Sequence, residues 1–200
     1  MKGKRYHRLR PLAEAAAALA LAQGLDFLRF FTLPEGGSVT LAMVPLVLYA
    51  LRWGLKKGAL LGLAFGVLGA VLRWDWIPVG LGRALGCAAL GTAALFRGQK
   101  QPKGALFGAL LGVPLRALFR ALTGICLLPE FTPERFLNLR MVSPAPFYVL
   151  HELLWASLNL LPTLLLLLPA SLLLRGFLAG DDLEDLEEEE DTGDGEETDA

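Results

Sequence analysis

Five ionisable residues interrupt the long apolar runs of this chain: Arg83, Arg116, Arg120, His151 and Glu152. A charge inside a membrane-spanning segment is costly, so such residues usually face a cavity or one another. Arg116 and Arg120 are one helical turn apart. Two interpretations are open. These residues line a binding site for a small polar molecule, or they form a structural ion pair in which Arg83 or Arg120 neutralises Glu152.

A stripe of polar and aromatic residues accompanies these charges near the end of the apolar sequence. Tyr148, His151, Trp155 and Asn159 follow one another at spacings of three and four, so they share one face of a helix. A lone histidine on such a face is usually a packing residue. Histidine, tryptophan and asparagine together beside an acid favour the lining of a pocket.

Two further tryptophans, Trp74 and Trp76, flank Asp75 in a short polar interruption. Tryptophan is enriched where membrane-spanning segments meet water, so both residues fit an interfacial belt. Aromatic rings also pair well with cations and flat rings, so a lid over a ligand is the alternative.

The residue types needed for catalysis or metal binding are scarce. The chain has two histidines and two cysteines, and each cysteine lies in an apolar run. His151 and Glu152 are adjacent, so their side chains point about 100° apart on a helix and are poorly placed to act on one substrate atom. We therefore expect no enzyme activity, no cofactor, no metal and no nucleic acid partner. The Walker A motif of ATPases is absent from the sequence.

The apolar content places these residues in a membrane. Apolar residues make up 54% of the chain and the mean hydropathy is +0.49, which is more than a soluble domain of 200 residues can hide. The sequence predicts an all-α integral membrane bundle of six helices. The second and third are shorter than the roughly 20 residues that a span needs, so we expect them to tilt or to extend into their flanks. The predicted helices cover residues 12–28, 39–51, 58–72, 78–96, 104–128 and 147–174.

The charges divide the chain into a basic body and an acidic tail. Residues 1–180 contain nineteen Lys and Arg and seven acids, and residues 181–200 contain the other thirteen acids. The tail has few apolar residues with which to repay the entropy of ordering, so residues 179–200 are predicted to be disordered, after a membrane domain over residues 1–178.

The cationic residues also predict the orientation. With the N-terminus in the cytoplasm, twelve Lys and Arg fall in inside segments and four in outside segments. We therefore expect a multi-pass plasma membrane protein with both termini in the cytoplasm. A basic start before an apolar run is also typical of a cleaved signal peptide, but the run continues to Phe31 and leads directly into a Gly-rich segment.

That Gly-rich segment carries a resemblance to a known family. Pro34 restricts the backbone, Gly36 and Gly37 allow positive φ, and Ser38 and Thr40 can cap the next helix. Residues 33–66 resemble the ThiT family, the thiamin-binding S components of energy-coupling factor (ECF) vitamin transporters. The matching residues are Leu33-Pro34-x-Gly36-Gly37-Ser38-Val39-Thr40-Leu41, then Met43-x-Pro45, then Ala50-Leu51-Arg52-x-Gly54-x-Lys56-x-Gly58.

The resemblance implies a fold and a function. An S component captures a vitamin outside the cell and delivers it to a coupling membrane subunit and two ATPase subunits. It also implies that the first helix docks on the coupling subunit through its small residues, Ala13, Ala16, Ala17 and Ala20. The alternative is a membrane interaction or regulatory module on the same scaffold that no longer transports. The predicted ligand-binding residues are Gly37, Ser38, Trp74, Arg83, Arg116, Arg120, Tyr148, His151, Glu152, Trp155 and Asn159.

The pocket positions depart from the family pattern. Gly80 and Ala84 stand where the family has an acid or amide and an aspartate, and Arg120 stands where it has a histidine. Trp155 stands where the family has a stacking tyrosine, and Asn159 lies one turn beyond the position of the family's asparagine. Thiamin is a cation, and three arginines against one glutamate do not suit it. The sequence therefore predicts an anionic or zwitterionic ligand, such as a phosphorylated or carboxylated vitamin precursor.

Overall fold

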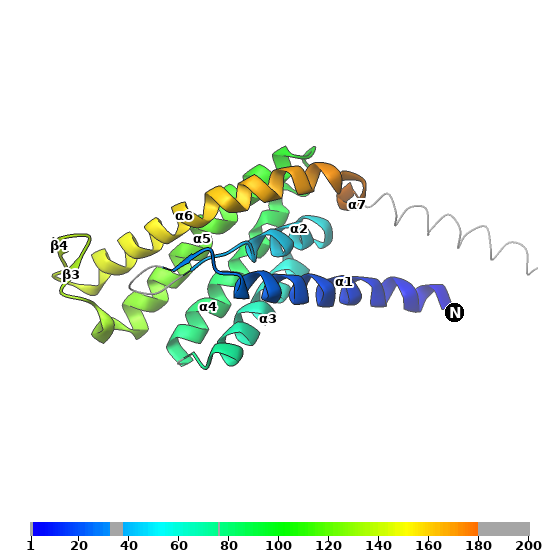
Figure 1. Ribbon diagram of the computed structural model, residues 1–200. Helices are drawn as coiled ribbons and strands as arrows, with labels where there is room; N and C mark the ends of the chain where they lie inside the picture. Colours follow the sequence, from blue (N-terminus) through cyan, green and yellow to red (C-terminus); the bar gives the residue numbers. More distant parts are fainter. Residues whose placement is uncertain (1, 33–37, 76, 180–200) are drawn as a thin grey trace, which may run out of the picture.

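The computed structural model describes residues 2–32, 38–75 and 77–179 as a bundle of helices with two short antiparallel ribbons (Figure 1). The predicted all-helical architecture is confirmed in its main features. The described elements are α1 (Lys2–Phe27), β1 (Phe31–Thr32), β2 (Ser38–Val39), α2 (Met43–Trp53), α3 (Leu55–Arg73), α4 (Ile77–Ala89), the 3-10 helix η1 (Leu90–Phe96), α5 (Lys103–Leu127), the 3-10 helix η2 (Pro129–Phe131), β3 (Arg135–Phe136), β4 (Leu139–Arg140), α6 (Pro144–Leu173) and α7 (Arg175–Ala179).

The helix count differs from the predicted six. The described part of the chain contains seven α-helices, because it turns after Leu173 into the five-residue α7. The helix predicted at 78–96 is α in its first part and 3-10 in its second. The first helix begins ten residues earlier than predicted and includes Pro11. The predicted tail disorder concerns residues that, from 180 on, lie outside the described residues.

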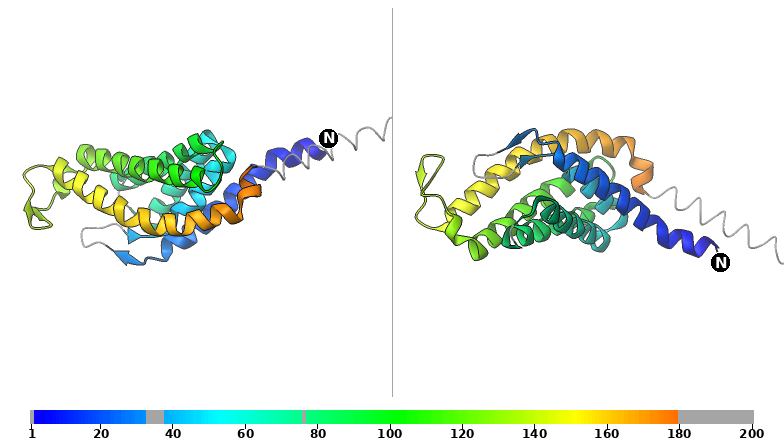
Figure 2. Two further views of the ribbon diagram at one scale, coloured as in Figure 1. Left: turned by 90° about the horizontal axis from the view of Figure 1, so that it is seen from above. Right: turned by 60° about the horizontal axis from the view of Figure 1, so that its bottom comes forward.

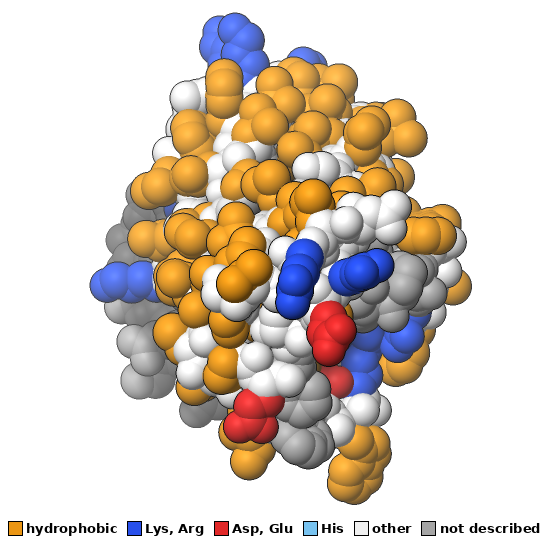
Figure 3. Space-filling model, turned by 90° about the vertical axis from the view of Figure 1, so that its left-hand side faces the viewer, with side chains coloured by type: hydrophobic (Ala, Val, Ile, Leu, Met, Phe, Trp, Pro, Cys, Tyr) orange, Lys and Arg blue, Asp and Glu red, His pale blue; other side chains and the backbone are white. Residues whose placement is uncertain are grey.

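Four of the described helical segments are long and apolar enough to cross a membrane: Leu55–Arg73, Ile77–Phe96, Lys103–Leu127 and Pro144–Leu173. Large apolar side chains point outward from them. Leu161 and Leu165 of α6, for example, are more than three-quarters exposed. Figure 3 looks at the end of the molecule that carries the β3–β4 ribbon, and hydrophobic side chains cover most of that face. Such a surface suits lipid rather than water.

Glycines bring α3 and α4 into close contact. Gly62 and Gly66 lie one helical turn apart on α3 and are buried. Their missing Cβ atoms would fall on the backbone of Cys87 and of Ala84, respectively. Gly58 lies in the same way against Ala50 of α2. Small residues at this spacing let helix backbones approach closely in lipid, where apolar side chains gain little by leaving the solvent.

The described chain ends lie at the same end of the molecule, and the ribbons lie toward the other. Figures 1 and 2 show the start of α1 and the end of α7 together, with the β3–β4 ribbon at the opposite end of α6. The β1–β2 ribbon pairs Phe31 with Val39 and Thr32 with Ser38. The Gly-rich segment is thus flanked by a short antiparallel ribbon, and residues 33–37 lie outside the described residues.

We expect Gly62→Ala to destabilise the fold by about 1–3 kcal/mol, because the added methyl group overpacks the contact with Cys87. Thermal unfolding in detergent measures this. The matched control is Gly24→Ala in α1, where nothing lies within 4 Å of the added carbon. Since alanine favours helix over glycine, the control should be neutral or stabilising. Equal effects of the two substitutions would contradict the packing role.

Candidate functional site

Two arginines of α5 meet one tryptophan of α6. The guanidinium carbons of Arg116 and Arg120 lie 4.6 Å and 5.4 Å from the ring centre of Trp155. Gly86 of α4 makes room for their stems, because a Cβ there would come within 3.2 Å of both side chains. Arginine stacks well on an indole face, and the contact strengthens as water is excluded. Three helices therefore converge on this cation–aromatic cluster.

Glu152 is the acid of this cluster. Arg120 Nε donates a hydrogen bond to Glu152 Oε1 at 3.0 Å, and His151 Nδ1 lies 3.5 Å from the same oxygen. The predicted structural ion pair thus exists, with Arg120 as the partner. The other oxygen, Oε2, is buried and has no hydrogen-bond partner. A buried carboxylate oxygen without a donor is costly, so this atom is available to a ligand or to water.

Arg83 belongs to a second charged cluster. Its Nη1 lies 3.8 Å from Asp26 Oδ2 and its Nε lies 3.5 Å from Asp75 Oδ2. Arg73 Nη2 donates to the same Asp26 oxygen at 2.5 Å. The expected count of three arginines against one glutamate is therefore corrected, because Asp26 and Asp75 take part. Both aspartates lie close to helix ends, and from the sequence alone a charge at a helix end is expected to face water. No sign of their pairing with Arg83 is therefore visible in the sequence.

Asn159 and Trp155 hold β2 against α6. Trp155 Nε1 donates to the Ser38 carbonyl oxygen at 3.2 Å, and the backbone N–H of Thr40 donates to Asn159 Oδ1 at 3.1 Å. Asn159 Nδ2 in turn donates to the Trp155 carbonyl oxygen at 3.0 Å. The structure therefore brings Ser38, Trp155 and Asn159 together, as the predicted site requires. Gly37, predicted beside them, lies outside the described residues.

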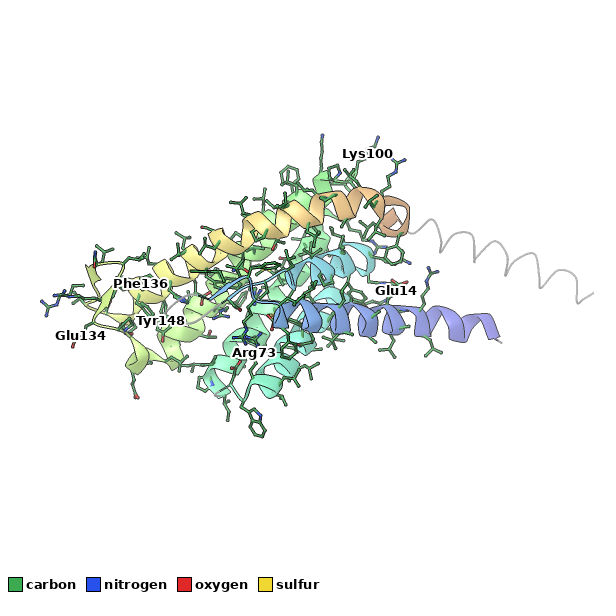
Figure 4. The ribbon with its side chains drawn as sticks, in the orientation of Figure 1. Glu14, Arg73, Lys100, Glu134, Phe136 and Tyr148 are labelled. Carbon is green, nitrogen blue, oxygen red and sulfur yellow. The ribbon has the colours of Figure 1, made fainter. Side chains whose placement is uncertain are left out.

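Two other predicted residues brace the end of the bundle. The Tyr148 hydroxyl donates to the Leu128 carbonyl oxygen at 2.7 Å, after the last turn of α5. His151 is buried between Phe136 and Phe147, with ring centres 5.9 Å and 5.6 Å away. Figure 4 shows Phe136 and Tyr148 at the β3–β4 end of α6. These contacts are structural, and a ligand role for either side chain stays a prediction.

Trp74 lies apart from these residues. It follows the last turn of α3 with a left-handed backbone, φ 54°, and 92% of its surface is exposed. This exposure fits an interfacial aromatic. Trp76, its predicted companion, is not among the described residues.

A groove of about 290 Å³ opens between α5 and α6 next to this cluster. Its lining side chains are apolar except for Ser157 and Glu152. Arg116 Nε, like Glu152 Oε2, is buried without a hydrogen-bond partner. Of the residues in the cluster only Glu152 lines this groove, and Trp155 and Arg116 are buried outside its lining. The arrangement therefore places a buried donor and a buried acceptor close to an apolar groove, as in sites for small polar molecules.

Comparison with known proteins decides the family. The family model described as thiamine transporter protein matches residues 12–136, more than half of the chain. The chain belongs to this family. The thiamine transporter ThiT of Bacillus subtilis (strain 168) is 28% identical over an alignment 140 residues long that covers 62% of this chain and 73% of that protein. The solved structure of ThiT from Listeria monocytogenes has the same fold, with a TM-score of 0.67 at 17% identity, over 78% of this chain and 90% of that one.

Because the chain belongs to the thiamine transporter family and has several apolar helices, it is a multi-pass membrane transport protein. The stretch that matches the family model includes Asp26, Arg83, Arg116 and Arg120. It ends at residue 136, so Glu152 and Trp155 lie beyond it. The family match therefore does not cover the cluster residues on α6, and their place in the site rests only on the geometry of this chain.

We expect Arg120→Met and Glu152→Gln to destabilise the protein singly, and the double variant to be more stable than the sum of the two effects predicts. Each single change leaves one buried polar or charged group without its partner, at a cost of several kcal/mol. A coupling free energy of about 1–3 kcal/mol from detergent unfolding would be typical of contacting residues. Strictly additive effects would show that the pair contributes nothing to the fold.

Proposed function

We propose that the protein is the substrate-binding S component of an ECF-type importer, which captures thiamine or a close relative from outside the cell. Membership in the thiamine transporter family supports this proposal. The observation that carries it is the cluster around Trp155, where a stacking face and unpartnered buried polar atoms meet beneath β2. Helix bundles place ligand sites between facing helices in this way.

Thiamine has chemistry that this cluster can recognise. Its aminopyrimidine ring is flat and can stack on the Trp155 indole, and its exocyclic amine can donate to Glu152 Oε2. Arg116, Arg120 and Asn159 contact one member of this pair or both, and Tyr148 and His151 brace the same end of α6. We therefore assign stacking to Trp155 and hydrogen-bond acceptance to Glu152.

The small-residue face of α1 suits docking on a coupling subunit. Ala13, Ala16, Ala17 and Ala20 are exposed, whereas Ala15, Ala18 and Leu19 pack against the core. One turn beyond Ala20, Gly24 has no other side chain within reach of a Cβ atom. These small residues form a strip along α1 with exposed Leu12 and Leu21 beside it, and such a strip allows another helix to approach closely.

A network at the opposite end from the ribbons fixes the rotation of α1. Glu14 Oε2 accepts hydrogen bonds from Arg52 Nε and from Trp53 Nε1, both at 2.7 Å. The Tyr49 hydroxyl donates to the Pro11 carbonyl oxygen at 3.0 Å. Figure 4 marks Glu14 on α1 beside α2. Because Glu14 points into the bundle, the alanine face must point out of it.

Transport would then need partners. The sequence has no ATPase motif, so we propose a coupling membrane subunit and two ATPase subunits as the source of energy. In this proposal the chain ends face the cytoplasm, in line with the cationic residues near them. The β1–β2 ribbon and the β3–β4 loop then face outward, where the ligand enters.

Thiamine titration of the purified protein tests the ligand assignment. We expect Trp155→Leu to weaken binding at least about tenfold, because it removes the stacking face and the hydrogen bond to Ser38. Trp53→Phe is the matched control, since Trp53 lies in the Glu14 network at the other end of α1. Wild-type protein that fails to bind thiamine or its phosphate ester would refute the proposed function.

Co-purification with coupling and ATPase subunits tests the docking surface. We expect Ala20→Trp to abolish assembly while ligand binding by the isolated protein stays unchanged, because the added ring protrudes from the small-residue face of α1. Leu165→Trp, at an exposed position of α6, should assemble normally. If the wild-type protein recruits no such subunits, a non-transporting interaction module is the better description.

A further inference from the structure

The charges buried around the candidate site do not cancel. Arg73 and Arg83 are paired with Asp26 and Asp75, and Arg120 is paired with Glu152. Arg116 is the remaining cation. Within the described parts of the chain it has no carboxylate within ion-pair distance and no hydrogen-bond acceptor for its Nε. Among the described residues, its surroundings therefore carry one positive charge more than the nearby carboxylates balance.

Arg116 is deeply buried as well as without a carboxylate partner among the described residues. Only 7% of its surface is exposed, and it lies on α5 between Gly86 of α4 and Trp155 of α6. Burying an ionised group without a counter-charge is strongly unfavourable, and more so in a membrane. The stacking on Trp155 offsets only part of this penalty. A positive charge held in this way is best explained by a function that supplies the missing anion.

We propose that Arg116 is the receptor for an anionic group of the ligand, so that the preferred ligand is a phosphate- or carboxylate-bearing form of the vitamin and not the free cation. This inference rests on the proposed function, because it concerns the same site. The guanidinium presents a planar set of donors that matches the oxygens of a phosphate or carboxylate. Trp155 lies against the same guanidinium, so the flat part of the ligand can stack while its anion reaches Arg116.

Two residues of the cation–aromatic cluster, Glu152 and Arg116, divide the recognition between them. Glu152 Oε2 remains free to accept from the amine of the ligand, and Arg116 Nε remains free to donate to its anion. A ligand with both groups satisfies both atoms, whereas free thiamine satisfies only the acceptor and adds a second positive charge beside Arg116. Like charges in a medium of low dielectric repel strongly.

Calorimetric titration of the purified full-length protein with thiamine and with thiamine monophosphate, at matched ionic strength, tests this. We expect the wild-type protein to bind the monophosphate at least about tenfold more tightly, as is typical of a charge-assisted hydrogen bond. Arg116→Met should reduce this ratio to about one or below, and Arg116→Lys should retain part of it. Arg140→Met, which removes an exposed arginine from β4, should leave both affinities unchanged.

The possible outcomes separate this inference from the function on which it rests. Wild-type protein that binds thiamine as tightly as the monophosphate overturns the role of Arg116 and leaves the proposed function standing. Binding of neither compound overturns both. A last experiment asks whether another acid of the chain neutralises Arg116. Glu35 is the acid to test, because it is close to Ser38 in the sequence and lies outside the described residues. If Glu35→Gln creates a preference for the monophosphate that the wild-type protein lacks, then Glu35 and not the ligand neutralises Arg116.

Discussion

The need to pair charges inside an apolar bundle shapes this protein. Glu14 binds Arg52, Asp26 binds Arg73, and Glu152 binds Arg120. Each pair joins two different helices, so the same interactions that make buried charge tolerable also fix how those helices are placed. Isolated ion pairs of this kind are weak sources of stability, but a missing partner is costly, and this makes the helix arrangement specific.

α6 connects that arrangement to the candidate site. Its successive turns contribute Glu152, Trp155 and Asn159, which contact α5 and β2. Because the three side chains are spaced three and four residues apart, one rigid helix determines their relative positions. The β1–β2 ribbon is therefore held by the same element that carries the stacking surface. Any movement of α6 would act on both at once.

The scaffold and the site follow different rules of composition. Glycines at Gly62, Gly66 and Gly86 bring helices close together or make room for long side chains. Gly62 and Gly66 let the backbones of α3 and α4 pack closely, and Gly86 leaves space for the side chains of Arg116 and Arg120. At the α3–α4 contact, therefore, the helix packing depends on glycines and not on the side chains of the candidate site, whereas the α5–α6 contact includes the Arg120–Glu152 pair.

Hydropathy by itself located four of the six predicted membrane helices, because burial in lipid is a local property of each segment. The helices predicted at 58–72 and 104–128 agree with α3 and α5 within a few residues. The stripe from Trp155 to Asn159 followed from helical spacing alone, and the Gly-rich segment identified the family. Only the tertiary structure decided which charges meet. Asp26 pairs with Arg83 across helices far apart in sequence, and this leaves Arg116 without a carboxylate among the described residues, because pairing depends on how helices pack and not on their local pattern.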